Sequence, residues 1–192
     1  MTALRHASPL SFPIKQNELE VGGMPLTQLA ARIGSTPFYA YDRQLITARV
    51  AQLRAALSPE IHLHYAIKAN PMPAVVQHLA GLVDGFDVAS VGEMRIVLDT
   101  AMAVDKISFA GPGKTEHALR QAAEAGIVLN LESEREMEIL ARVGAELGVR
   151  PKAAVRVNPD FELKTSGMKM GGGPKPFGVD AERVPAMLAR MK

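Results

Sequence analysis

The stretch Ile61-His62-Leu63-His64-Tyr65-Ala66-Ile67-Lys68-Ala69-Asn70 opens the repeating pattern that decides the fold. It is a largely apolar run that ends in a lysine, and a turn rich in proline follows it. Further strand-like runs begin at residues 85, 106, 127 and 153, and segments with apolar side chains at helical spacing lie between them. Strands that alternate with helices are typical of an α/β fold with a parallel sheet.

The same pattern predicts the individual elements. We predict strands at 38–41, 61–67, 85–89, 106–110, 127–131 and 153–158. We predict helices at 25–33, 43–57, 73–82, 91–102, 116–125, 133–147 and 180–191, with the rest of residues 1–36 irregular. Two of these helices begin with a Ser-x-x-Glu capping box, at Ser90 with Glu93 and at Ser133 with Glu136.

The spacing of the strands narrows the fold class. Steps of 21 to 26 residues between strand starts suit a TIM-type (β/α)8 barrel better than a doubly wound sheet, although both remain open on this criterion. No Gly-x-Gly-x-x-Gly pattern follows the first strand, which weakens a dinucleotide-binding interpretation. A closed barrel needs about eight strands and typically ~250 residues. We therefore expect an incomplete barrel whose C-terminal strands are missing from this chain.

Composition excludes several kinds of function. The 192 residues contain no cysteine, which excludes disulfides, thiolate metal sites and a cysteine nucleophile. A net charge of +2 without basic runs, together with only 5% aromatic residues, argues against nucleic-acid binding. The apolar runs are too short to span a bilayer and the first ten residues lack the apolar core of a secretory signal, so we expect a cytoplasmic protein with no membrane partner.

Residues late in the strands are the candidates for chemistry, because parallel α/β folds place their active sites at the carboxyl ends of strands. Alternation along the strands turns Lys68, Asp87, Asn130 and Arg156 to the inside of the predicted barrel. A lysine that is partly shielded from water loses its proton more easily and can act as a Schiff-base nucleophile. The alternatives are a lysine that extends to water and a purely structural ion-pair network.

Three other patterns are weaker. The run Gly111-Pro112-Gly113-Lys114-Thr115 imitates the end of a P-loop, but Ser108 stands where that motif needs a glycine, so we predict a strand-to-helix turn. His62 and His64 have no third ligand at metal-binding spacing, and we predict no metal site. The glycines 171–173 lie in a long loop, which we interpret as a substrate loop rather than a phosphate site.

Three motifs resemble those of the fold-type III pyridoxal-phosphate decarboxylases, which include the diaminopimelate, ornithine and arginine decarboxylases. The stretch from Tyr65 to Asn70 resembles the motif of the cofactor lysine, the stretch from Gly85 to Glu93 resembles a second signature, and Val155-Arg156-Val157-Asn158-Pro159 resembles a third. The resemblance spans about residues 37–180. It implies that residues 1–36 join a separate β-domain and that residues 37–192 form the N-terminal part of a barrel that binds pyridoxal 5'-phosphate.

The resemblance also implies a role for each matching residue. Lys68 would form a Schiff base with the cofactor, Asp87 would orient the lysine and the ring, and Arg156 would lie close to the ring. Glu93 would support these contacts from further away. Pro176 stands where the family commonly has a lysine. The family's ring-stacking histidine, phosphate-binding glycine loop and Glu-Pro-Gly-Arg segment would follow residue 192.

The activity implied is decarboxylation of an amino acid, with loss of CO2 and release of an amine. Residues 166–175 resemble a subgroup linked to exosortase or carrier-protein pathways, so the substrate would be a free amino acid or an aminoacyl carrier protein. A racemase on the same barrel is one alternative, which Pro71-Met72-Pro73 after the lysine motif disfavours. The other is a non-catalytic fragment that binds a partner protein. We expect a homodimer when the protein is complete and little turnover from this chain alone.

Overall fold

The computed structural model describes residues 12–161 and 176–191, and its contacts divide the chain into two compact units, Met1–Ile61 and His62–Lys192. The described core side chains all belong to the second unit, from Ile67 to Met187. Between residues 12 and 61 every side chain is exposed or half-buried. None of the helices in the described residues is long and apolar enough to cross a bilayer.

The first unit begins with a small antiparallel sheet where the sequence predicted irregular chain. Its strands are β1 (Ile14–Lys15), β2 (Glu18–Val21) and β3 (Met24–Pro25). Two-residue turns join them, at Gln16-Asn17 and Gly22-Gly23, and all four residues have positive φ, as tight hairpin turns require. The helices α1 (Leu26–Ile33) and α2 (Arg43–Ala56) follow. The strand predicted at 38–41 is wrong, because these residues have no strand partner.

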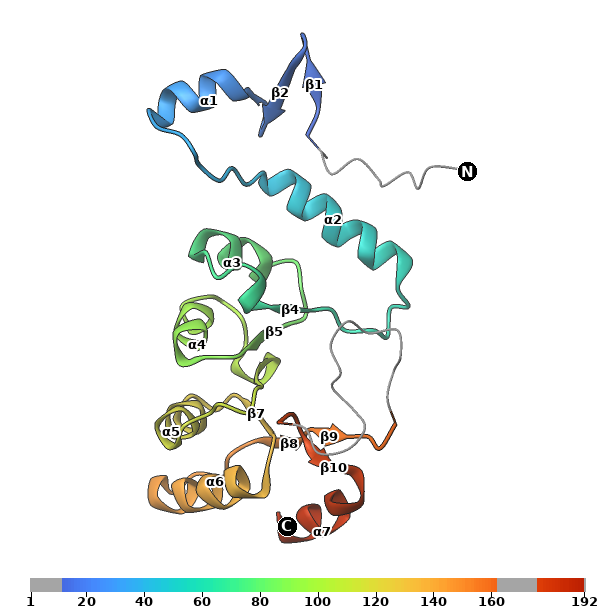
Figure 1. Ribbon diagram of the computed structural model, residues 1–192, viewed down its shortest axis with the longest axis vertical. Helices are drawn as coiled ribbons and strands as arrows, with labels where there is room; N and C mark the ends of the chain where they lie inside the picture. The colour runs from blue at the N-terminus through green and yellow to red at the C-terminus, as the bar shows by residue number, and fades with distance from the viewer. Residues whose placement is uncertain (1–11, 162–175, 192) are drawn as a thin grey trace. The chain divides into compact units, whose positions relative to one another are not determined.

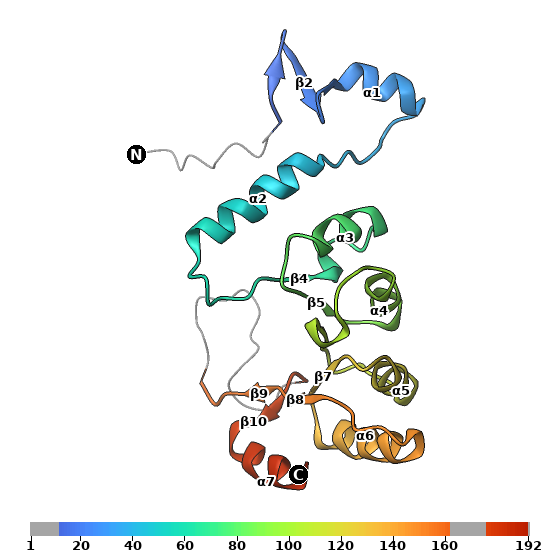
Figure 2. The ribbon, with the colours of Figure 1, turned by 180° about the vertical axis from the view of Figure 1, so that it is seen from behind.

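The second unit contains a parallel sheet of five strands in sequential order. The strands are β4 (His64–Ala66), β5 (Gly85–Val88), β6 (Ile107–Phe109), β7 (Val128–Leu131) and β8 (Ala153–Val155). The connecting helices are α3 (Pro73–Ala80), α4 (Val91–Leu98), α5 (Glu116–Ala125) and α6 (Glu134–Leu147). All four helices lie along one side of the sheet, as Figures 1 and 2 show from opposite directions. This is the arrangement of a TIM-type barrel over its first strands.

The hydrophobic core lies between this sheet and its helices. Six strand side chains are at most 1% exposed: Phe86, Val88, Ile107, Phe109, Leu129 and Leu131. Helix side chains such as Val76, Leu119 and Val143 are completely buried against them. Because neighbours along a strand point to opposite faces, the residues between these apolar positions face away from the helices. The polar residues of the strands therefore gather on the other face of the sheet.

The predicted strand 153–158 is interrupted at Arg156, where the chain changes partner. The Arg156 amide donates to the Leu131 carbonyl oxygen of β7, and the Arg156 carbonyl oxygen accepts from the Val179 amide of β10. Beyond this residue, β9 (Val157–Asn158) pairs in parallel with β10 (Val179–Asp180). The helix predicted from residue 180 therefore begins later, with the short 3₁₀ helix η3 (Ala181–Arg183) and then α7 (Val184–Arg190).

Candidate active site

A row of hydrogen-bonded polar side chains crosses the face of the sheet that lies opposite the helices. Each of four neighbouring strands contributes one residue: His64, Asp87, Ser108 and Asn130. The Ser108 hydroxyl donates to Asp87 Oδ1 over 2.6 Å and accepts from Asn130 Nδ2 over 3.2 Å. His64 Nδ1 lies 3.3 Å from the same oxygen of Asp87. The Asp87 carboxylate is thus held from both neighbouring strands.

Gly85 makes room for the His64 ring at one end of this row. Gly85 is the register partner of His64 in the neighbouring strand. A Cβ atom on Gly85 would lie 2.5 Å from His64 Cε1 and would also meet the carbonyl oxygen of Lys106. Any side chain here would displace the ring from Asp87, so the row depends on a glycine that itself carries no chemistry.

Lys68 lies just beyond the carboxyl end of β4, and this strand is shorter than the predicted 61–67. The strand ends at Ala66 and the chain turns into the 3₁₀ helix η1 (Ile67–Ala69). The side chain of Ile67 is completely buried and anchors this turn, whereas Lys68 is exposed. Tyr65 Oη donates to the Asn70 carbonyl oxygen over 3.3 Å, and this hydrogen bond stabilises the turn. The lysine amine therefore belongs to a fixed turn at the strand end.

Glu93 lies at the start of α4 and contacts the backbone. Its Oε2 accepts from the Ala89 amide over 2.7 Å, while the Ser90 hydroxyl accepts from the Glu93 amide over 3.2 Å. This is a variant of the capping box, in which the glutamate reaches the residue before the N-cap. In the structure Glu93 fixes the loop after β5, and its predicted support of a cofactor stays a prediction.

Arg156 is held by a buried carboxylate that sequence reasoning missed. Arg156 Nη1 donates to Glu132 Oε1 over 3.0 Å, and the guanidinium lies 5.0 Å from the centre of the Phe177 ring. The Glu132 side chain is 1% exposed, whereas a third of the Arg156 side chain is exposed. Glu132 also accepts from the amides of Gly111 over 2.7 Å and Gly178 over 2.8 Å.

A second buried ion pair adjoins Glu132. Glu136 Oε2 accepts from the Glu132 amide over 2.8 Å and lies 3.1 Å from Lys114 Nζ. Lys114 also donates to the Gly111 carbonyl oxygen over 2.5 Å, and its side chain is only 1% exposed. Lys114 belongs to the turn between β6 and α5 that the sequence predicted, yet its burial was not foreseen. One sequence signal could have indicated this burial: Lys114 stands next to glycines and directly before the N-cap Thr115, in a tight turn at the end of a strand.

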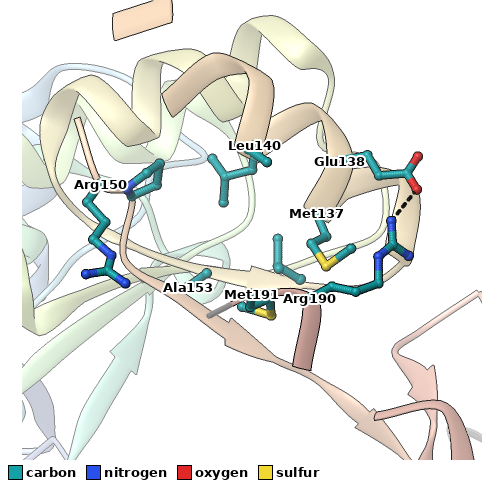
Figure 3. A pocket seen from close by; sticks show the side chains of 10 residues that line it. Met137, Glu138, Leu140, Arg150, Ala153, Arg190 and Met191 are labelled. Carbon is teal, nitrogen blue, oxygen red and sulfur yellow. Dashed lines mark hydrogen bonds and ion pairs between the residues drawn. The ribbon is translucent and has the colours of Figure 1, made fainter. Parts of the chain in front are cut away.

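The glycines 171–173 and the rest of the loop 162–175 lie outside the described residues. A separate cavity of about 270 Å³ lies between α6, β8 and α7 (Figure 3). Apolar side chains such as Met137 and Leu140 line it, and the ion pair of Glu138 with Arg190 lies at its edge. This cavity is on the helix-facing side of β8, so it is distinct from the polar row.

Comparison with known proteins identifies this arrangement. The family described as pyridoxal-dependent decarboxylases, pyridoxal binding domain, matches residues 43–192. The chain belongs to this family. Its members use pyridoxal phosphate as their cofactor, and membership together with the parallel sheet confirms the predicted fold class, the N-terminal part of a TIM-type barrel.

Individual relatives match most of the length of this chain. The diaminopimelate decarboxylase of Pseudomonas aeruginosa is 38% identical over 183 residues, which are 94% of this chain and 44% of that protein. The L-glutamyl-[BtrI acyl-carrier protein] decarboxylase of Niallia circulans is 33% identical, over 85% of this chain and 38% of that protein. The crystal structure of diaminopimelate decarboxylase from Helicobacter pylori, complexed with L-lysine, superposes with a TM-score of 0.77 at 29% identity, covering 85% of this chain and 42% of that one. The chain thus spans about two fifths of the length of these relatives.

Proposed function

We propose that this chain is the cofactor-binding, N-terminal part of a pyridoxal-phosphate-dependent amino-acid decarboxylase, in which Lys68 holds the cofactor covalently. One observation carries the proposal. Lys68 is an exposed amine on a fixed turn at the carboxyl end of β4, and the neighbouring strand carries Asp87 in a hydrogen-bonded row. Active sites of barrels are built at these strand ends.

The residues around Lys68 suit a flat, charged cofactor. Directly after the carboxyl ends of β5 and β6 stand Ala89 and Ala110, whose side chains are small. Arg156 supplies a positive charge at the end of β8, held in place by Glu132. An amine can react with an aldehyde, a fixed carboxylate can orient a protonated ring, and a fixed guanidinium can bind an anion. All three groups lie at one end of this sheet.

When bound, pyridoxal phosphate supplies an electron-withdrawing ring that accepts the electron pair left behind as a carboxyl group departs as CO2. The task of this chain is positioning. Lys68 fixes the cofactor at the strand end. Asp87, itself oriented by Ser108 and His64, orients the lysine and the ring, and Arg156 supplies positive charge close to the ring. Glu93 fixes the start of the loop that follows β5, two residues beyond Asp87.

For the substrate we propose an amino acid, either free or carried as an aminoacyl group on a carrier protein. The relatives support this class, since they include diaminopimelate decarboxylases and a decarboxylase of an L-glutamyl carrier protein. Both are named as decarboxylases, which favours this activity over racemisation. We further infer a homodimer for the complete protein, as the family resemblance implied, and a cytoplasmic location, as the sequence analysis predicted.

We also propose that the segment up to residue 36 joins a second domain, and that residues 37–192 belong to the barrel. The hairpin strands and α1 have no buried side chain of their own. They border an apolar cavity of about 740 Å³, lined by residues such as Leu19, Val21 and Phe38. A sheet that exposes an apolar face in this way needs a further layer of structure to cover it.

Trapping of the cofactor on its lysine tests the proposed function. The purified chain is incubated with pyridoxal phosphate, reduced with borohydride and digested, and the labelled peptides are identified by mass spectrometry. We expect the label on Lys68, its loss in Lys68→Ala and its retention in Lys152→Ala, which removes an exposed lysine before β8. A label spread evenly over surface lysines in all three proteins would contradict the proposal and favour a chain that binds partners without binding the cofactor.

A further inference from the structure

The Glu132 carboxylate gathers donors from three separate parts of the chain. Its two oxygens accept from the Gly111 amide after β6, from the Gly178 amide before β10 and from the Arg156 guanidinium between β8 and β9. With 1% of its side chain exposed, Glu132 cannot be solvated by water instead. Such a buried carboxylate is stable only because charged and amide donors satisfy it.

Both amides reach Glu132 from backbone conformations that glycine adopts readily. The φ angles are 112° at Gly111 and 83° at Gly178, in the left-handed region that disfavours side chains. At Gly178 a Cβ atom would lie 2.9 Å from the Arg156 carbonyl oxygen. The two glycine turns and Arg156 therefore form a binding site for the Glu132 carboxylate.

A second buried ion pair lies beside the Glu132 carboxylate. Lys114 and Glu136 form the adjoining buried pair, and Glu136 binds the backbone amide of Glu132 itself. Among the described residues, Arg156 and Lys114 are thus each paired with a buried carboxylate at this end of the sheet. The Arg156 side chain remains a third exposed.

We propose that Glu132 is a positioning residue of the cofactor site, which acts by fixing the guanidinium of Arg156 and the two glycine turns beside it. This inference rests on the proposed function, since it gives Arg156 a cofactor to meet. It assigns Glu132 a role through Arg156 and makes a specific claim about coupling: once Arg156 is changed, the Glu132 carboxylate has no charged side chain of the cofactor site left to position, although it still binds the two glycine amides.

A double-mutant cycle tests this coupling. The proteins are the parent chain, Glu132→Gln, Arg156→Gln and the double variant. The matched control is Glu138→Gln, because Glu138 lies in α6, shortly after Glu132, and makes an exposed ion pair with Arg190 of α7. The first measurement needs no cofactor: the NMR signal of the Arg156 side-chain Nε–H group reports whether the guanidinium is ordered. We expect a single ordered signal in the parent and the control, and an averaged signal in Glu132→Gln.

The second measurement is the dissociation constant of pyridoxal phosphate, obtained from the absorbance of the lysine-bound cofactor. Since a charge-assisted hydrogen bond is lost, we expect Glu132→Gln and Arg156→Gln each to weaken binding by about tenfold or more. The double variant should bind no more weakly than Arg156→Gln alone, within about twofold, and Glu138→Gln should match the parent.

The outcomes separate the two proposals. If Glu132→Gln weakens binding equally with and without Arg156, Glu132 supports the fold in general and the positioning role is wrong. If the parent chain takes up no cofactor on Lys68, the proposed function fails for this chain. The NMR measurement then decides the inference, which is overturned if the Arg156 signal is unchanged in Glu132→Gln.

Discussion

At the scale of single residues, the site depends on positions that carry no reactive group. Gly85 is the clearest case, because its missing side chain allows the His64 ring to lie beside Asp87. The row His64–Asp87–Ser108–Asn130 is continuous only as long as that space stays empty. The structure of the site is therefore sensitive to a methyl group at a position that no catalytic argument would select.

We predict that Gly85→Ala lowers the free energy of unfolding by about 1–3 kcal/mol, because a methyl group must displace both a ring and a backbone carbonyl oxygen. Urea unfolding measures the loss. Gly81→Ala is the matched control, since a Cβ atom there meets nothing within 4 Å, and it should be neutral or stabilising by about 0.4–1 kcal/mol. Adding His64→Ala to Gly85→Ala should restore only part of the loss, because the Lys106 carbonyl oxygen stays in place. Complete restoration would show that the ring alone causes the strain.

Sequence reasoning located some of these residues and missed others for a physical reason. Alternation along a strand is a local property, and it was sufficient to turn Asp87 and Asn130 to one face. The partners of Glu132 are not local: the amide of Gly178 is 46 residues away and that of Gly111 is 21 residues away. Only the three-dimensional arrangement brings such groups together, so a buried carboxylate at this position had no signature in the sequence.

At the scale of helices and strands, local signals predicted the elements well where capping residues stand at their ends. Helix α5 has the predicted bounds, Glu116–Ala125, between the N-cap Thr115 and the C-cap Gly126. Helix α4 is shorter than the predicted 91–102. It ends at Leu98, where the Thr100 hydroxyl donates to the Val97 carbonyl oxygen and accepts from the Met102 amide. Apolar spacing continues past this point, so the pattern alone could not show the end.

Helices α5 and α6 are joined on their exposed sides by a network of ion pairs. Arg142 donates to both oxygens of Glu116 over 2.8 Å and also pairs with Glu146, which in turn pairs with Arg120. The hydrogen bond from Arg142 lowers the pKa of Glu116, and the hydrogen bond from Arg120 lowers the pKa of Glu146. A carboxylate whose pKa is lowered by folding stabilises the fold above its unfolded pKa, and this contribution disappears as the pH falls.

We predict that Arg142→Gln flattens the acid side of the stability profile. Starting from neutral pH, the thermal midpoint of the parent should fall more steeply than that of Arg142→Gln once the pH drops below about 4.5, the ordinary pKa of glutamate. Thermal unfolding followed by circular dichroism across this range makes the comparison. Arg135→Gln, an exposed arginine on the same helix, is the control and should follow the parent. Parallel curves for all three proteins would show that the network makes no contribution to the pH dependence of the thermal midpoint, since many exposed ion pairs contribute little to stability.

At the scale of the whole molecule, stability is concentrated in one unit. The described hydrophobic core runs from Ile67 to Met187, and residues 12–61 contribute no buried side chain. Burial of apolar surface is the main favourable contribution to folding, so the second unit holds the cooperative structure of this chain.

We predict that a chain of residues 62–192 folds cooperatively without the first unit. Its thermal midpoint should lie within about 4 °C of that of the full chain, the shift that ~1 kcal/mol produces in a domain of between about 100 and 150 residues. Circular dichroism melting of both chains measures this, and limited proteolysis of the full chain should yield the same resistant piece. A shortened chain with no cooperative transition would show that the first unit is required for the core to form.

The two Ser-x-x-Glu caps show that the same local arrangement occurs at the ends of two different strands. Asp87, Ser90 and Glu93 are followed 43 positions later by Asn130, Ser133 and Glu136, and in both places the glutamate binds the amide of the residue before the serine. The chain thus uses one capping arrangement twice, after β5 and after β7, although α4 and α6 differ in length. At the position before the serine, the first arrangement has the exposed Ala89 and the second has the buried Glu132. The same cap can therefore follow an uncharged strand end or a buried carboxylate, and only the second has the Gly111, Gly178 and Arg156 donors around it.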